Sequence, residues 1–114
     1  MGTGKSGRRL NTKGNIVSLI KSLPTKPNKN FLEYWEDITH PEARKNSDGT
    51  KFKHKETGLE VRFDPAKEGA SGFEGKDHWH VYNPNKTGKK DYHLDKDGNP
   101  VAKGSKASHI ISES

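Results

Sequence analysis

The chain is small and polar, with 114 residues, 26% of them hydrophobic, and no cysteine, which excludes disulfide bonds and thiolate chemistry. It shows no signal peptide and no apolar run long enough to span a membrane, so no membrane partner is expected. Seven of the 21 basic residues and no acidic residue fall in the first 30 positions, which leaves 14 basic against 15 acidic residues in the remainder. The net charge of +6 therefore predicts a flexible basic arm over residues 1–14 more than a basic domain.

Two helices are predicted at the start of a single domain over residues 15–111. In residues 15–23 the apolar side chains follow helical spacing, and Pro24 ends the segment. A second stripe predicts a helix over residues 30–38, with Asn30 as its N-cap. Residues 41–44 are expected to add a turn. Both stripes indicate packing against a core.

From residue 46 onward the apolar pattern has the two-residue period of β-strands. The predicted strands are residues 51–55, 59–63, 77–82, 92–94 and 100–102. Turn sequences separate them, with a tight hairpin turn at residues 56–58. This order predicts an α+β fold in which N-terminal helices pack on a bent antiparallel β-sheet.

Alternation along the strand at residues 77–82 points Trp79 and Val81 into the core. The side chains that alternate with these two then lie on the opposite face of the strand, which we expect to be exposed. That face would collect six candidate catalytic residues: Glu60, Arg62, His78, His80, Tyr82 and His93.

Such a face suits the cleavage of RNA without a metal, which requires a base, an acid and a cation beside the phosphate. Imidazoles titrate near neutral pH, so His78 and His80 are candidates for base and acid, in either order. Their Cβ atoms should lie about 6–7 Å apart, roughly the width of a phosphodiester. Arg62 would bind the phosphate with its guanidinium fork, and Tyr82 would stack on a base.

Further polar side chains near these strands are candidates for binding the flanking RNA. They are Lys76, Lys86, Lys89, Lys90, Ser108 and His109. The lysines would contact backbone phosphates, and the hydroxyl and imidazole near the C-terminus would add polar contacts.

Other interpretations of the same residues remain open. His78, His80 and His93 resemble a three-imidazole zinc site, to which Asp77 or Asp95 would add a carboxylate. The polar face could also be a solvated surface, with Arg62 paired to Glu60 or Asp64.

Three further motifs are rejected. Residues 2–6 lack the first glycine and the preceding strand of a P-loop. Residues 95–99 lack the last ligand of a calcium loop and predict a hairpin turn. No Gly-x-Ser-x-Gly motif is present, which argues against a serine hydrolase.

Four segments together resemble the C-terminal toxin domains of bacterial polymorphic toxins, the tips of contact-dependent inhibition, Rhs and cell-wall-associated proteins. They are residues 59–64, 72–84, 92–95 and 98–101, and Asp-His-Trp-His-x-Tyr-Asn-Pro is their most specific motif. The resemblance implies a barnase-like or colicin-type ribonuclease that cuts tRNA or rRNA of competing bacteria without a cofactor. Glu60, Arg62 and His78 would fill the Glu, Arg and His roles of a barnase-like site.

The resemblance also implies a protein partner and a route of delivery to the target cell. A cognate immunity protein, expected to be acidic, would bind the toxin as a heterodimer, and the free toxin would be a monomer. The domain would be delivered as the tip of a larger secreted or cell-surface protein, and would act in the cytoplasm of the target cell. A sole methionine at position 1 fits a fragment of such a parent. A metal-dependent nuclease acting on DNA and a non-catalytic binding module are the alternatives.

Overall fold

The computed structural model describes residues 12–46 and 48–112, so residues 1–11 of the predicted arm lie outside the described part. Helix α2 spans Lys13–Lys21 and helix α3 spans Lys29–Tyr34. The Thr12 hydroxyl accepts a hydrogen bond from the Asn15 amide, and Asn28 caps α3 in the same way. Both predicted helices are present, but α2 begins two residues before the predicted start at residue 15, and Asn28, not Asn30, is the cap of α3.

The prediction of a helix over residues 30–38 is wrong for its second half, because the chain continues there as strand β1, Trp35–Asp37. Trp35 is extended and pairs with His54 of the neighbouring strand. The side chain of Tyr34 is 62% exposed, so it does not continue the apolar stripe. Strand pairing that buries Trp35 thus overrides the local helical spacing. Helix α4, Pro41–Asn46, follows where a turn was expected.

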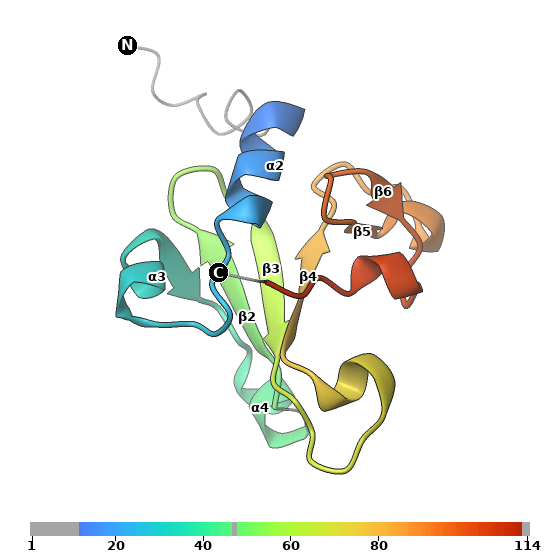
Figure 1. Cartoon of the computed structure of the whole chain (residues 1–114). Coiled ribbons are helices and arrows are strands. Elements are labelled where there is room, and N and C mark those ends of the chain that lie inside the picture. Colours follow the sequence, from blue (N-terminus) through green and yellow to red (C-terminus); the bar gives the residue numbers. More distant parts are fainter. Residues whose placement is uncertain (1–11, 47, 113–114) are drawn as a thin grey trace.

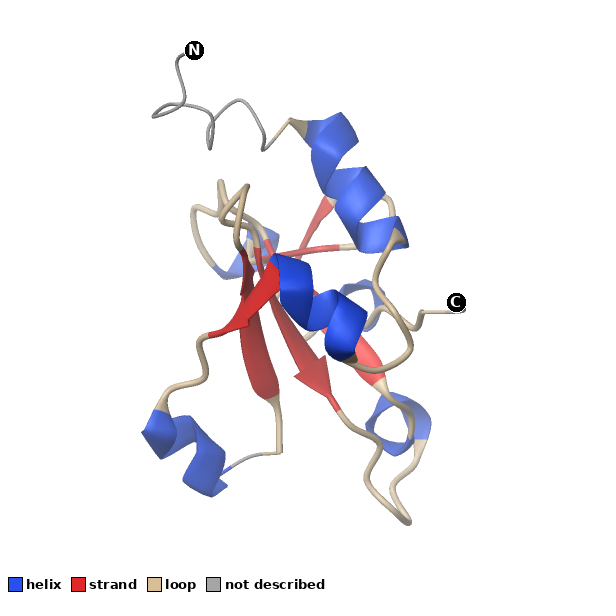
Figure 2. Ribbon diagram, turned by 90° about the vertical axis from the view of Figure 1, so that its left-hand side faces the viewer, coloured by secondary structure: helices blue, strands red, loops and turns tan. Residues whose placement is uncertain are grey.

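Six strands form one sheet in the order β1-β2-β3-β4-β5-β6, and every neighbouring pair is antiparallel (Figure 1). The remaining strands are β2 Thr50–His54, β3 Glu60–Asp64, β4 His78–Tyr82, β5 His93–Leu94 and β6 Pro100–Val101. Short 3₁₀ turns cover Gly72–Gly75, Lys89–Asp91 and Lys106–Ser108. In Figure 2, α3 crosses in front of the strands and α2 lies above them. The predicted α+β class is confirmed.

Trp79 is the centre of the hydrophobic core, with no exposed surface. Its ring centroid lies 5.1 Å from that of Phe31 on α3 and 4.9 Å from that of Phe63 on β3. The indole Nε1–H donates to the Pro24 carbonyl at 2.8 Å, so its one polar atom is satisfied inside the core. None of the helices in the described part of the chain has the length and hydropathy of a membrane-spanning segment.

The C-terminal segment pairs with β4 through two hydrogen bonds. The Trp79 amide donates to the Ile110 carbonyl at 2.7 Å, and the Ile110 amide donates back at 2.9 Å. Directly opposed residues of an antiparallel pair point to the same face. Ile110 therefore enters the core beside Trp79, and His109, one residue earlier, is directed to the opposite face.

Ile110 and its neighbour Ile111 provide a test of this arrangement. Ile110 is 6% exposed and Ile111 is 41% exposed. Ile110→Ala should lower the free energy of unfolding in urea by about 2–4 kcal/mol, because it leaves a cavity beside Trp79. The matched variant Ile111→Ala should change it by no more than about 0.5 kcal/mol. Equal losses would contradict the docking of the tail on β4.

Candidate functional site

The predicted facing of β3 and β4 is confirmed by their register. Arg62 lies directly opposite His80, and Asp64 lies directly opposite His78. All four side chains share the face opposite the Trp79 core. Tyr82 pairs with His93 of β5, which brings His93 to the same face. The two-residue period therefore places the imidazoles beside a guanidinium, as expected.

The expectation that this face is exposed is wrong. His78, His80 and His93 are each only 4% exposed. The cover comes from the distant C-terminal tail and from the turn just before β4, where the Phe73 ring stacks on the His109 ring with 4.6 Å between centroids. The His109 ring lies 5.0 Å from that of His78 and 4.7 Å from that of His80. The tail and the 3₁₀ turn at Gly72–Gly75 thus convert an open face into a lined pocket.

Asp64 is the electrostatic centre of this cluster. Arg62 donates to both carboxylate oxygens, from Nε at 2.9 Å and from a terminal nitrogen at 2.8 Å. Asp64 Oδ2 also lies 3.3 Å from His78 Nε2 and 3.4 Å from His80 Nε2. Burial opposes ionisation of the carboxyl, but the hydrogen bonds from His80 and Arg62 prevail and hold the pKa of Asp64 well below its usual range. Asp64 is therefore a carboxylate at all ordinary pH values.

Asp64 also affects the pKa values of its two basic neighbours, Arg62 and His80. Burial acts to lower the pKa of Arg62, but hydrogen bonding and the charge of Asp64 raise it above its ordinary value. His80 behaves in the opposite way. Burial, together with the charge of Arg62, lowers the pKa of His80, and its contact with Asp64 offsets this only in part. His80 is thus mainly neutral at pH 7.

Two imidazoles are held in a defined tautomer by backbone carbonyls. His78 Nδ1 donates to the Lys76 carbonyl at 2.9 Å, and His109 Nδ1 donates to the Ser105 carbonyl at 2.9 Å. A carbonyl only accepts, so each Nδ1 carries a proton. The Nε2 atoms of His78 and His109 are therefore left to bind or release a proton, or to ligate a metal ion.

A pocket of about 290 Å³ opens beside these rings. Its polar lining includes Arg62, Lys67, Glu74, His78, His80 and His109. Imidazole nitrogens and a guanidinium thus meet in one concave space, together with the carboxylates of Asp48 and Asp64. This combination can bind an anionic group and exchange protons with it.

Three predicted catalytic residues lie outside the pocket lining. Glu60 forms an ion pair with Lys51 at 3.1 Å, and the Lys51 ammonium also lies 4.7 Å from the Tyr82 ring centroid. Tyr82 packs against His93, with 5.1 Å between ring centroids. The His93 ring centroid lies 5.0 Å from that of His80, and neither buried nitrogen of His93 has a hydrogen-bond partner. These three residues share the sheet face with the pocket but do not line it.

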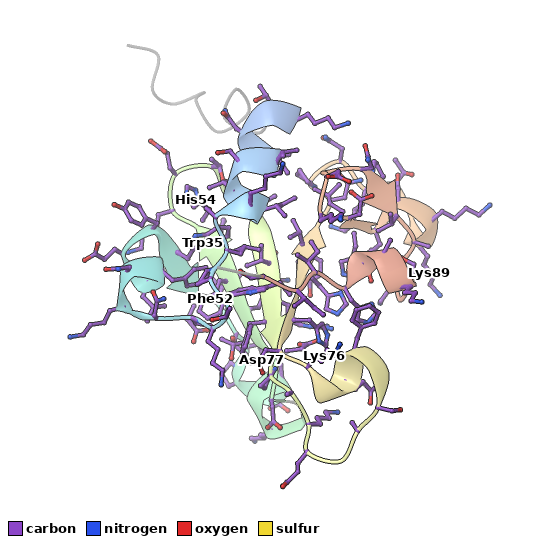
Figure 3. The ribbon with its side chains drawn as sticks, in the orientation of Figure 1. Trp35, Phe52, His54, Lys76, Asp77 and Lys89 are labelled. Carbon is purple, nitrogen blue, oxygen red and sulfur yellow. The ribbon has the colours of Figure 1, made fainter. Side chains whose placement is uncertain are left out.

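The candidate RNA-binding residues are spread over separate places. His109 joins the pocket, whereas Ser108 is fully buried and donates its hydroxyl to the Ser105 carbonyl, which gives it a structural role. In Figure 3, Lys76 lies close to Asp77, which directly precedes β4, and Lys89 lies apart from them on the β5–β6 side.

Residues 86–90 and Lys103 form a second, basic surface on that side. The ammonium groups of Lys86 and Lys103 lie 5.4 and 4.8 Å from the Tyr92 ring centroid. Together with Lys89 these residues line a hollow of about 340 Å³. Lys90 is exposed in the adjoining 3₁₀ turn.

The carboxylates proposed to complete a zinc site have other partners. Asp77 accepts a hydrogen bond from the Ala66 amide at 2.7 Å and lies 3.5 Å from Lys26 Nζ. Asp95 accepts hydrogen bonds from the amides of Asp97 and Asn99, both at 2.9 Å. The hairpin turn predicted at residues 95–99 is confirmed.

Sequence reasoning missed Phe73 and Glu74 as members of the site, and it named Asp64 only as a possible partner of Arg62. Asp64 has the same strand parity as Arg62 and follows it by two residues, which could have identified it as a site residue. Phe73 and Glu74 lie in a 3₁₀ turn between two predicted strands, for which strand periodicity gives no facing.

Comparison of the chain with known proteins finds no matching family model, no matching curated protein and no matching solved structure.

Burial of a neutral His93 predicts a pH-dependent loss of stability. Burial, with the nearby charges of His80 and Arg62, lowers the pKa of His93 from 6.5 to about 4. Between these values the unfolded chain binds more protons, so stability is complete above about pH 6.5 and falls as the pH approaches 4. At pH 5 the loss from this residue should be about 2 kcal/mol.

His93→Leu should remove most of this dependence, because leucine does not titrate. Urea denaturation at pH 7.5 and pH 5 measures it, with the exposed His40→Gln as control. An undiminished pH dependence in His93→Leu would rule out a buried neutral imidazole at this position.

Proposed function

We propose that the chain is an endoribonuclease that cleaves tRNA or rRNA by metal-independent transesterification of the RNA backbone. The single observation that carries the proposal is that His78, His80 and His109 line one pocket with Arg62. Such a pocket brings together the acid, the base and the cation that 2′-hydroxyl attack on phosphorus requires. The resemblance to polymorphic toxin tips supports RNA as the substrate and bacterial competition as the setting.

His109 is the best candidate for the general base. It is the least buried of the three rings in the pocket, and its Nδ1–H is fixed by the Ser105 carbonyl. Its Nε2 lone pair would accept the proton of the 2′-hydroxyl. The oxygen would then attack phosphorus and displace the 5′-oxygen, to give a 2′,3′-cyclic phosphate.

His78 is the best candidate for the general acid. With Nδ1 donating to the Lys76 carbonyl, a second proton on Nε2 would face Asp64 Oδ2 at 3.3 Å. Asp64 stabilises this imidazolium, which would pass its proton to the leaving 5′-oxygen. His80 is neutral, and would orient Asp64 through its Nε2–H.

Arg62 would stabilise the charge that grows on the phosphate. Nε and one terminal nitrogen hold Asp64, which fixes the plane of the guanidinium. The group has five N–H donors, so others remain for phosphate oxygens. The hollow around Tyr92, with Lys86, Lys89 and Lys103, would bind a more distant part of the RNA backbone.

A cognate immunity protein, delivery as the tip of a larger protein and action in the target cytoplasm belong to the same proposal. An acidic immunity protein would complement the basic hollow and block access of RNA. The monomeric toxin and the toxin–immunity heterodimer are the expected states.

The test is incubation of purified chain with total RNA in excess EDTA. We expect endonucleolytic cleavage that leaves 2′,3′-cyclic phosphate ends, detected by end mapping. His109→Gln should lower the rate by about 10²–10⁴-fold, because it removes the base. The exposed His40→Gln should retain it.

Two outcomes would overturn the proposal. Intact RNA in EDTA, with DNA cleavage after a divalent ion is added, would favour the metal-dependent nuclease. No cleavage of either nucleic acid, with or without metal, would favour the non-catalytic binding module.

A further inference from the structure

We infer that His78, His80 and His109 form a binding site for a divalent transition-metal ion of the zinc class, and that the bound ion inhibits the enzyme. The binding is independent of the proposed function, whereas the inhibition rests on it. The inference starts from the three rings, each of which places one nitrogen within 4.8 Å of the nitrogens of the other two.

The spacing is close to that of a loaded site. Zinc binds imidazole nitrogens at about 2.0–2.1 Å, so a tetrahedral site needs its ligand atoms about 3.4 Å apart. Small ring rotations would bring nitrogens separated by at most 4.8 Å to that distance. Asp64 Oδ2 already lies 3.3 and 3.4 Å from the Nε2 atoms of His78 and His80. This carboxylate is therefore placed to supply a fourth ligand.

Two of the three rings, His78 and His109, have the surroundings that metal-binding histidines require, whereas His80 Nδ1 is buried without a partner. A ligating imidazole usually donates its other N–H to a carbonyl or carboxylate, which fixes the tautomer and the ring plane. His78 does so to the Lys76 carbonyl and His109 to the Ser105 carbonyl, both at 2.9 Å. Arg62 holds Asp64 through two hydrogen bonds, as outer partners hold a ligating carboxylate.

The charges around the pocket permit a cation. Asp48, Asp64 and Glu74 line it against the two cations Arg62 and Lys67. The excess carboxylate offsets part of the charge of a divalent ion.

The third imidazole is His109 and not His93, which sequence spacing had suggested. His93 contacts the far side of His80, and both its nitrogens are buried away from the pocket without partners. His109 reaches the cluster because the Trp79–Ile110 hydrogen bonds fix its facing. The metal set thus combines two residues of β4 with one from the tail.

Inhibition follows from the same atoms. An ion bound by the Nε2 atoms of His78 and His109 removes the lone pair and the proton that the proposed base and acid would use. RNA cleavage should therefore stop when the site is filled and resume when EDTA removes the ion.

The experiment is isothermal titration of the chelator-treated chain with ZnCl₂, without RNA. We expect one ion per chain with micromolar or tighter affinity, and a visible spectrum of tetrahedral cobalt when CoCl₂ replaces zinc. His109→Gln should weaken zinc binding by at least about 100-fold, because even outer partners account for 10–100-fold. His93→Leu should bind zinc as the unchanged chain does.

Other results would overturn the inference. Absence of saturable binding, or binding that persists in His109→Gln, would exclude this site. Loss of binding in His93→Leu with retention in His109→Gln would show that His93 is the third ligand. RNA cleavage in EDTA is measured separately, so failure of the ribonuclease proposal leaves the zinc titration interpretable.

Discussion

The ion pair between Arg62 and Asp64 is the interaction on which the polar face of this protein depends. Without the carboxylate, the partly buried guanidinium would lose two hydrogen bonds and its counter-charge, and burial makes an unpaired charge costly. Asp64 accepts two hydrogen bonds from Arg62 and faces two imidazoles at 3.3 and 3.4 Å. One carboxylate thus joins a guanidinium and two buried imidazoles in a single polar cluster.

The core and the site are opposite faces of the same strand. Trp79 fixes the position of β4 by packing against Phe31 and Phe63 and by donating to the Pro24 carbonyl. Because side chains alternate, a rigid Trp79 also fixes the directions of its two neighbours, which are the site histidines. The Ile110 bridge extends this control to the tail. A functional site needs its side chains held in fixed positions, and the packing of β4 against the core holds the site histidines in this way.

The sequence was sufficient for the parts of the fold governed by local periodicity. Alternation in residues 77–82 predicted which side chains of β4 face the core, and turn residues predicted the two hairpins. It failed where long-range contacts decide. Trp35 fits helical spacing, but pairing with His54 makes it a strand residue. The burial of His78 and His80 depends on Phe73 and the tail, and no spacing within β4 encodes their approach.

The approach of the tail changes the chemistry that the strand alone would have. On an open face the two histidines would be solvated and free to rotate. Enclosure by His109 and Phe73 brings the rings within contact distance, and backbone carbonyls fix the Nδ1 protons of His78 and His109. The Nε2 atom of His78 lies 3.3 Å from Asp64 Oδ2, and either a proton or a metal ion can bridge these two atoms. A proton in that position would serve the proposed acid, whereas a metal ion there would block it. The same geometry therefore supports both catalysis and its inhibition.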